Sequence, residues 1–138
     1  MTTRVLFLCT HNAARSQMAE ALLRHVAGKR FEVESAGTAP TEVHPLAVAV
    51  MREIGIDASG QRAKDVSEVE EHPDIVITLC DDAREACPVF PGAPRFLHWS
   101  LPDPAAARGD EAAATAAFRQ VRDTLAGLIR KFIEGVEQ

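Results

Sequence analysis

A short apolar run leads directly into a reactive loop and then into a helix at the start of the chain. Residues 5–8 are Val, Leu, Phe and Leu, which is the composition of a strand buried on both faces. Apolar positions from Ser16 onward have helical spacing and Gly28 provides a stop, so a helix is predicted over residues 16–27. A buried strand followed at once by a helix is typical of a parallel sheet.

The same alternation continues along the chain. Strands are predicted at residues 31–37, 75–79 and 95–98, and helices at residues 45–54 and 111–136. Charged residues alternate in the second strand, which favours an edge position, whereas the almost wholly apolar third strand is expected to be central. We therefore predict an α/β fold in a single domain, residues 1–138, with a four-stranded parallel sheet and helices on both faces.

Helical spacing also predicts the buried side of each helix. The stripe of the first helix is expected to include Val26, and that of the second to include Ile54. Ser67 and Glu70 have the spacing of a capping box, which predicts a short helical turn. The stripe of the last helix is assigned to the core, and its members are Phe118, Val121, Leu125, Leu128, Ile129 and Phe132.

The loop after the first strand combines a thiol with groups that bind anions. Cys9 and Arg15 are separated by five residues, so the intervening amides can form a nest while the guanidinium binds two oxygens. The N-terminus of a helix favours both a thiolate and a bound oxyanion. Ser16, expected as the N-cap, can donate its hydroxyl to the Cys9 sulfur. A structural cysteine beside a surface arginine is the alternative, but this placement favours a nucleophile beneath a tetrahedral oxyanion.

Two more cysteines follow the third predicted strand. Cys80 stands at the carboxyl end of that strand, where ligands bind in open parallel sheets, so we expect it to face the same crevice as Cys9. Cys87 lies two helical turns further on, roughly 10 Å away if the segment is helical. A disulfide needs Cα atoms within about 7 Å, so pairing Cys80 with Cys87 requires that segment to unwind. Two inert cysteines are the alternative, but three thiols in all favour redox chemistry.

Composition excludes several classes of function. The net charge of −5 argues against general nucleic-acid binding. The first apolar run is too short for a signal segment or a membrane span, so we expect a cytoplasmic protein without membrane contact. Paired Cys-x2-Cys or His-x3-His ligands are not found in the sequence, so neither a metal site nor a cofactor is predicted. We expect a monomer.

Residues 9–20 read Cys-Thr-His-Asn-Ala-Ala-Arg-Ser-Gln-Met-Ala-Glu. This segment resembles the active-site loop of the low-molecular-weight protein tyrosine phosphatase superfamily and, within it, that of the thioredoxin-coupled arsenate reductases. Thr78-Leu79-Cys80 and Cys87-Pro88 match the reductases as well, and the similarity extends to residues 34–37 and 98–99. It implies reduction of arsenate to arsenite, for arsenic detoxification. The paired later cysteines favour thioredoxin over a mycothiol or glutaredoxin system as reductant.

The resemblance also implies a role for each site residue. Cys9 attacks arsenic, Cys80 attacks the Cys9 sulfur, and Cys87 then attacks Cys80. Arg15 holds the oxyanion, and Asp103 is the general acid, although without the family match an Asp before Pro is an ordinary turn residue. The oxyanion is bound by the loop as a whole, which comprises Thr10, His11, Asn12, Ala13, Ala14, Arg15 and Ser16. No separate role is assigned to the imidazole of His11.

Two alternatives remain open. A phosphatase acting through a phosphocysteine at Cys9 is less favoured because Ala14 replaces the second loop cysteine of the phosphatases. Ala105 and Ala106 also replace the aromatic residues that wall a phosphotyrosine. A non-catalytic oxyanion-binding module is less favoured because a binder needs neither the nucleophile nor the acid, Asp103.

Some arsenate reductases of this type bind potassium beside the loop through an Asn, a Glu, a Ser and an Asp. Asn12, Glu20 and Ser35 match the first three, whereas Lys64 occupies the fourth position and Asp65 is displaced by one. Because a lysine ammonium supplies the charge of the cation, we predict that potassium is not required.

Overall fold

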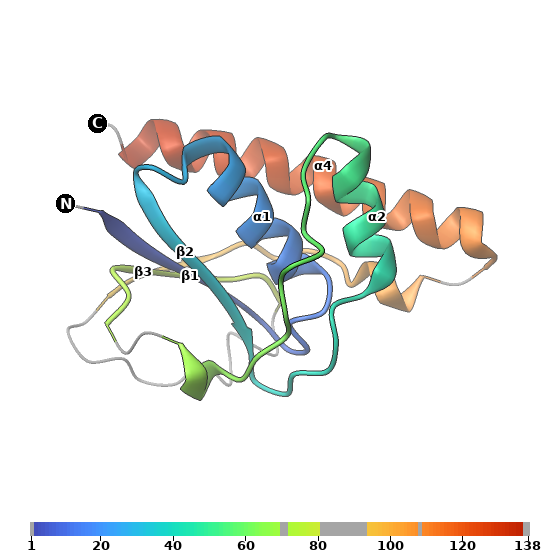
Figure 1. The fold of residues 1–138 in the computed structure, drawn as a ribbon, viewed down its shortest axis with the longest axis horizontal. Coiled ribbons are helices and arrows are strands. Elements are labelled where there is room, and N and C mark those ends of the chain that lie inside the picture. The colour runs from blue at the N-terminus through green and yellow to red at the C-terminus, as the bar shows by residue number, and fades with distance from the viewer. Residues whose placement is uncertain (1, 70–71, 81–93, 108, 137–138) are drawn as a thin grey trace.

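A computed structural model describes residues 2–69, 72–80, 94–107 and 109–136. Four parallel strands form one sheet in the order β2-β1-β3-β4 (Figure 1). The strands are β1 (Thr3–Cys9), β2 (Phe31–Gly37), β3 (Ile75–Thr78) and β4 (Arg95–His98). The predicted α/β fold with a four-stranded parallel sheet is thus confirmed, as are the edge position of β2 and the internal position of β3. Each side chain of β3 is buried, which explains its continuous apolar run.

The parallel register brings the carboxyl ends of three strands to one edge of the sheet. Cys9 at the end of β1 is paired with Gly37, and Leu8 is paired with Thr78. The loops that leave β1, β2 and β3 therefore start side by side. This edge is where the sequence predicts the reactive groups.

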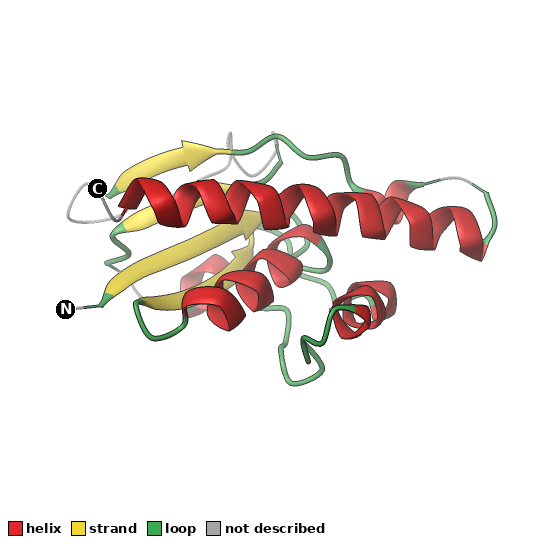
Figure 2. Ribbon diagram, turned by 90° about the horizontal axis from the view of Figure 1, so that it is seen from above, coloured by secondary structure: helices red, strands yellow, loops and turns green. Residues whose placement is uncertain are grey.

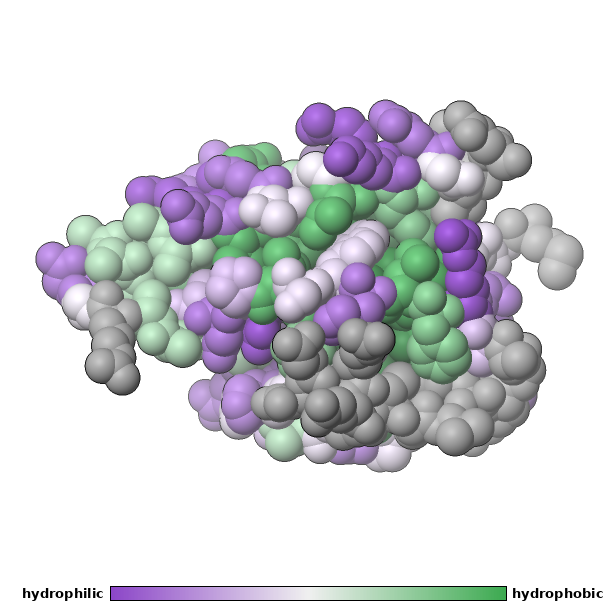
Figure 3. All heavy atoms as spheres, turned by 180° about the vertical axis from the view of Figure 1, so that it is seen from behind, coloured by the Kyte–Doolittle hydropathy of each residue, from purple (hydrophilic) through white to green (hydrophobic). Residues whose placement is uncertain are grey.

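Three α-helices, α1 (Arg15–Ala27), α2 (Pro45–Glu53) and α4 (Glu111–Val136), contact one another and gather on one face of the sheet (Figure 2). Two short 3-10 helices, η1 (Val66–Glu68) and η2 (Pro104–Ala106), lie in the connections. The sequence analysis expected helices on both faces, but no α-helix of the described residues covers the other face. On the side opposite to that viewed in Figure 1, apolar surface gathers in the middle of the molecule (Figure 3).

Aromatic rings connect α4 with the sheet inside the core. The rings of Phe31 and Phe132 lie 5.7 Å apart, and Trp99 packs against both Phe132 and Phe7 at 6.1 Å. The predicted apolar stripe of α4 faces this core, except that Leu128 is only partly buried. At the outer side of α4, Arg119 and Arg122 bind the carboxylate of Glu53 at the end of α2.

Several local predictions were wrong in detail. Val26 is 60% exposed because the last turn of α1 turns Ala27 inward instead, and Ile54 is 43% exposed because α2 ends before it and buries Ala47, Val50 and Met51. The first helix begins one residue early and its N-cap is Ala14, so Ser16 does not cap it.

The capping box also lies two residues earlier than predicted. Asp65 accepts a hydrogen bond from the amide of Ser67, and Glu68 accepts one from the amide of Asp65. An Asp at the N-cap serves as well as the Ser that the pattern suggested. No helix among the described residues is long and apolar enough to span a membrane.

Candidate active site

The loop between β1 and α1 turns its carbonyl oxygens away from its own centre. The oxygens of Thr10, His11 and Ala13 accept hydrogen bonds from the amides of Ala39, Thr41 and His44 at 2.8–3.0 Å. In contrast, no amide of residues 11–16 donates to an acceptor within the described part of the chain. The loop carbonyls therefore accept hydrogen bonds from the segment after β2, and the loop amides remain available to bind an anion, as expected of a nest.

The thiol of Cys9 lies at the start of α1 against a hydroxyl. Cys9 Sγ is 2.8 Å from Ser16 Oγ, and both residues are almost completely buried. Asn12, which adopts a left-handed backbone conformation at φ 50°, donates from Nδ2 to Ser16 Oγ at 2.7 Å. Since Ser16 accepts from Asn12, its own hydrogen is free to point at the sulfur. A hydroxyl donor and the positive end of α1 both favour a thiolate at Cys9.

Arg15 and Asp103 meet on the far side of the loop. Arg15 is largely buried; its Nη1 donates to the carbonyl of Leu101 at 3.0 Å, and its Nη2 is 4.0 Å from Asp103 Oδ2. The other carboxylate oxygen, Oδ1, accepts from the amide of Ala105 and caps η2. Asp103 is only partly exposed, and it has one oxygen held by this amide and the other directed toward Arg15.

These groups surround one cavity of about 660 Å³. Its lining includes Cys9, Arg15 and Asp103, together with His44 and Ala105. Ala105 leaves this wall without an aromatic ring. A small tetrahedral oxyanion fits a site made of amides, a guanidinium and a thiol better than an aryl ester, which needs apolar walls.

Cys80 lies next to the loop, but it is not among the residues that line the cavity, although the sequence predicted that it faces the same crevice as Cys9. It is buried, and its Sγ is 3.2 Å from the hydroxyl of Thr10, the residue that follows Cys9. Both Cys9 and Cys80 are free thiols. Cys87 lies outside the described residues.

Two residues at the site have no sequence signal that we recognised. His44 accepts a hydrogen bond from the amide of Leu46 through Nδ1, which caps α2, and its ring packs against Phe118 at 4.7 Å. The buried Gln17 donates to the Asn12 carbonyl and to the Arg62 carbonyl, and so ties the loop to a distant segment. The position of His44 directly before a helix-starting Pro45 was a possible signal for a cap.

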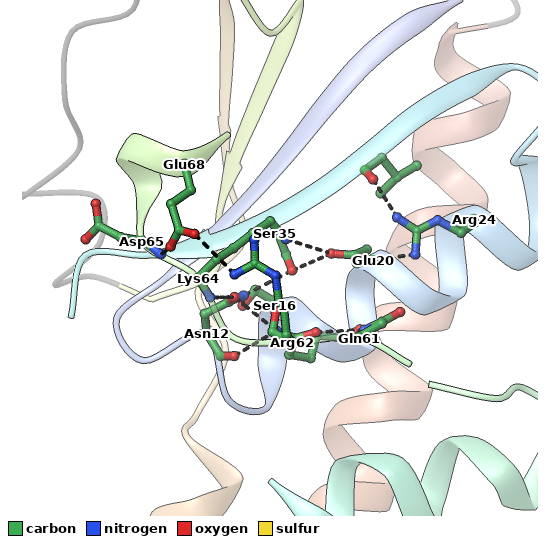
Figure 4. A network of polar contacts seen from close by, with 12 residues as sticks. Asn12, Ser16, Glu20, Arg24, Ser35, Gln61, Arg62, Lys64, Asp65 and Glu68 are labelled. Carbon is green, nitrogen blue, oxygen red and sulfur yellow. Dashed lines mark hydrogen bonds and ion pairs between the residues drawn. The ribbon is translucent and has the colours of Figure 1, made fainter. Parts of the chain in front are cut away.

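A polar cluster joins the loop to α1, to β2 and to the segment that precedes η1 (Figure 4). Asn12, Ser35 and Glu20 are linked by hydrogen bonds, and Lys64 Nζ lies 3.8 Å from Glu20 Oε1. Asp65 instead caps η1. A potassium site needs several oxygen ligands. Here the Lys64 ammonium lies beside the Glu20 carboxylate, and Asn12 turns its amide nitrogen, not its oxygen, toward Ser35. These residues therefore do not fit the potassium ion that some arsenate reductases of this type bind.

Comparison with known proteins agrees with this geometry. The family model described as low molecular weight phosphotyrosine protein phosphatase matches residues 4–138. The chain is 40% identical over 131 residues to the arsenate reductase of Bacillus subtilis, and the match covers 94% of each protein. It is similar to a solved arsenate reductase in the phosphate binding state, with a TM-score of 0.79, 31% identity and coverage of 97% and 98% of the two chains. It also resembles the thioredoxin-dependent arsenate reductase of Corynebacterium glutamicum, with a TM-score of 0.76, 34% identity and coverage of 99% of this chain and 62% of that one.

Proposed function

The chain belongs to the low molecular weight phosphotyrosine protein phosphatase family, and we propose that within this family it reduces arsenate to arsenite for arsenic detoxification. The relatives named arsenate reductase support this activity. The observation that carries the proposal is the second thiol: Cys80 Sγ lies against Thr10, one residue from the nucleophile Cys9. Hydrolysis of a phosphate ester needs only one thiol, whereas reduction needs a partner for it.

In the first step the loop amides and Arg15 hold the arsenate, and the Cys9 thiolate attacks arsenic. A sulfur–arsenic bond forms while an arsenic–oxygen bond breaks, and Asp103 gives its proton to the departing oxygen, which leaves as water. The Arg15 guanidinium, 4.0 Å from Asp103 Oδ2, keeps the Asp103 side chain directed into the cavity. The product is an arsenic(V) adduct on Cys9.

In the second step the Cys80 thiolate attacks Cys9 Sγ. The sulfur–arsenic bond breaks, its electron pair stays on arsenic, and arsenite leaves as a disulfide forms between the two cysteines. Cys87 then attacks Cys80 and releases Cys9 as a thiolate. An external dithiol of the thioredoxin type reduces the resulting Cys80–Cys87 disulfide. All of these groups belong to one chain, so a monomer in the cytoplasm suffices for the reaction.

A thiol count on reduced protein tests this sequence. The protein is desalted, given arsenate without reductant, alkylated, and mapped by peptide mass spectrometry, with phosphate as the control anion. We expect one arsenite per chain and a Cys80–Cys87 disulfide. Cys87→Ser is expected to stop at a Cys9–Cys80 disulfide, and Cys9→Ser to release no arsenite. If all thiols stay free in the presence of arsenate, the proposal is wrong.

A phosphatase activity is the second candidate, because Cys9, Arg15 and Asp103 are also the groups that a phosphocysteine mechanism needs. The alanine wall at Ala105 predicts slow turnover of aryl phosphates. Hydrolysis of a small aryl phosphate that exceeds arsenate reduction in kcat/KM would make phosphatase the main activity. Loss of both activities in Cys9→Ser, with phosphate still bound, is expected in either case. A binding module would show no turnover with any substrate.

A further inference from the structure

Glu20 places a charge inside the protein behind the catalytic loop. The Glu20 side chain is 6% exposed, and a buried carboxylate needs a charged partner and hydrogen bonds to offset the loss of water. Ser35 Oγ donates to Oε1 at 2.6 Å, Arg24 Nη1 binds Oε2 at 2.7 Å, and Lys64 Nζ lies 3.8 Å from Oε1. Arg24 is half exposed, whereas the Lys64 side chain is 14% exposed. Lys64 therefore supplies the buried counter-charge, and it does so at the oxygen that Ser35 binds.

Hydrogen bonds link this carboxylate through Ser35 and Asn12 to Ser16 (Figure 4), and they run in one direction only. Because Ser35 donates its hydrogen to Glu20, its oxygen can only accept from Asn12 Nδ2, at 3.0 Å. Asn12 Nδ2 gives its second hydrogen to Ser16 Oγ, at 2.7 Å. Ser16 then has its own hydrogen left for the Cys9 sulfur at 2.8 Å. A Glu20 carboxylate, which can only accept, thus determines which group donates in every hydrogen bond from Ser35 to Cys9.

The backbone of Lys64 orients Asn12, the residue in the middle of this series of hydrogen bonds. Its amide, which can only donate, is 2.9 Å from Asn12 Oδ1, and Gln17 Nε2 donates to the same oxygen at 3.0 Å. The Asn12 side chain is therefore oriented with its nitrogen toward Ser35 and Ser16. Lys64 acts on this network twice, through its amide and through its ammonium.

We propose that Lys64 is a positioning residue whose ammonium serves as a built-in cation behind the loop, pairing with the Glu20 carboxylate and thereby holding the Ser16 hydroxyl on the Cys9 sulfur. The ammonium stands in place of a free monovalent cation, so the wild-type protein does not respond to potassium. This inference deepens the proposed function, since it rests on Cys9 being the nucleophile. Alkylation of Cys9 measures its reactivity whether or not arsenate is reduced, so failure of either proposal is seen separately.

The test is the rate of Cys9 alkylation in Lys64→Ala, followed on the Cys9 peptide by mass spectrometry at neutral pH. We expect the rate to fall about threefold to tenfold, tenfold being equal to about 1.4 kcal/mol. Potassium or methylammonium, compared with sodium at the same ionic strength, is expected to restore the rate in the variant and to leave the wild-type rate unchanged. Lys64→Arg, which keeps a cation, is expected to retain most of the wild-type alkylation rate.

Arg62→Ala is the matched control, because Arg62 lies two residues away and its side chain pairs, among the described residues, only with the exposed Glu68. We expect it to alkylate like the wild type with every cation. A folded Lys64→Ala with an unchanged alkylation rate overturns the proposal even if its melting temperature falls, since that is the result of a merely structural role. Several-fold stimulation of the wild-type protein by potassium overturns it too. If Lys64→Ala does not fold, Lys64→Gln, which keeps the stem without the charge, decides between the same outcomes.

Discussion

Replacing Ser16 with alanine removes the hydroxyl that contacts Cys9 and leaves the rest of the loop sequence unchanged. The hydroxyl lies 2.8 Å from Cys9 Sγ and accepts from Asn12 Nδ2 at 2.7 Å. Both contacts are buried, so water cannot replace the lost group without rearrangement. The substitution therefore has two separable consequences, one for the thiolate and one for the fold.

The size of each effect follows from the contact that is lost. A hydrogen bond to a charged group contributes about 1.5–3 kcal/mol, which corresponds to about 10-fold to 150-fold in the equilibrium between thiol and thiolate. Under conditions where the neutral thiol predominates, the rate of Cys9 alkylation is expected to fall by at least the lower factor. The Asn12 N–H loses its acceptor inside the protein, which lowers the free energy of unfolding by about 1–3 kcal/mol.

Two measurements on the same protein separate these effects. The pH dependence of Cys9 alkylation reports the thiolate, and urea unfolding reports the fold. Ser100→Ala, at an exposed serine beyond β4, is the control and is expected to change neither. A folded Ser16→Ala protein whose Cys9 alkylates as fast as wild type at every pH would refute the reasoning, because the hydroxyl would then not stabilise the thiolate.

The remaining predictions concern stability. Hydrogen bonds from Arg119 and then Arg122 lower the pKa of Glu53 to about 2. The ionised Glu53 thus contributes to stability above the usual pKa near 4.5, and this contribution is lost as pH falls toward 2. In urea unfolding, Glu53→Gln should therefore be less stable than the wild type above pH 4.5, and the difference in unfolding free energy should shrink as pH falls toward 2. A Cβ on Gly37 would lie 2.6 Å from a loop carbonyl oxygen, so Gly37→Ala should lower the free energy of unfolding by about 1–3 kcal/mol and reduce arsenate reduction. Gly60→Ala, where the added Cβ meets nothing within 4 Å, should do neither.

Much of the fold follows from patterns that are local in the sequence. Continuous apolar runs identified β1 and β3 as internal strands, and charge alternation identified β2 as an edge strand. Periodicity was less reliable near helix ends, where Val26 and Ile54 are exposed, because burial there depends on where the neighbouring elements stop. The capping box was misplaced for a related reason: Asp65 and Ser67 are both good N-caps, and only the path of the chain selects one.

Local patterns suffice to place a thiol between a buried strand and a helix, an arginine six positions after it, and a second thiol after another buried strand. Those relations are short in sequence, and backbone geometry fixes them. The directions in which the loop groups point depend instead on the packing of distant segments. The carbonyls turn toward residues 39–44, Asp103 turns toward Arg15, and Asn12 is oriented by Lys64, 52 residues away. Such contacts depend on which hydrogen-bond partner the packed elements bring within about 3 Å, and no local pattern encodes that.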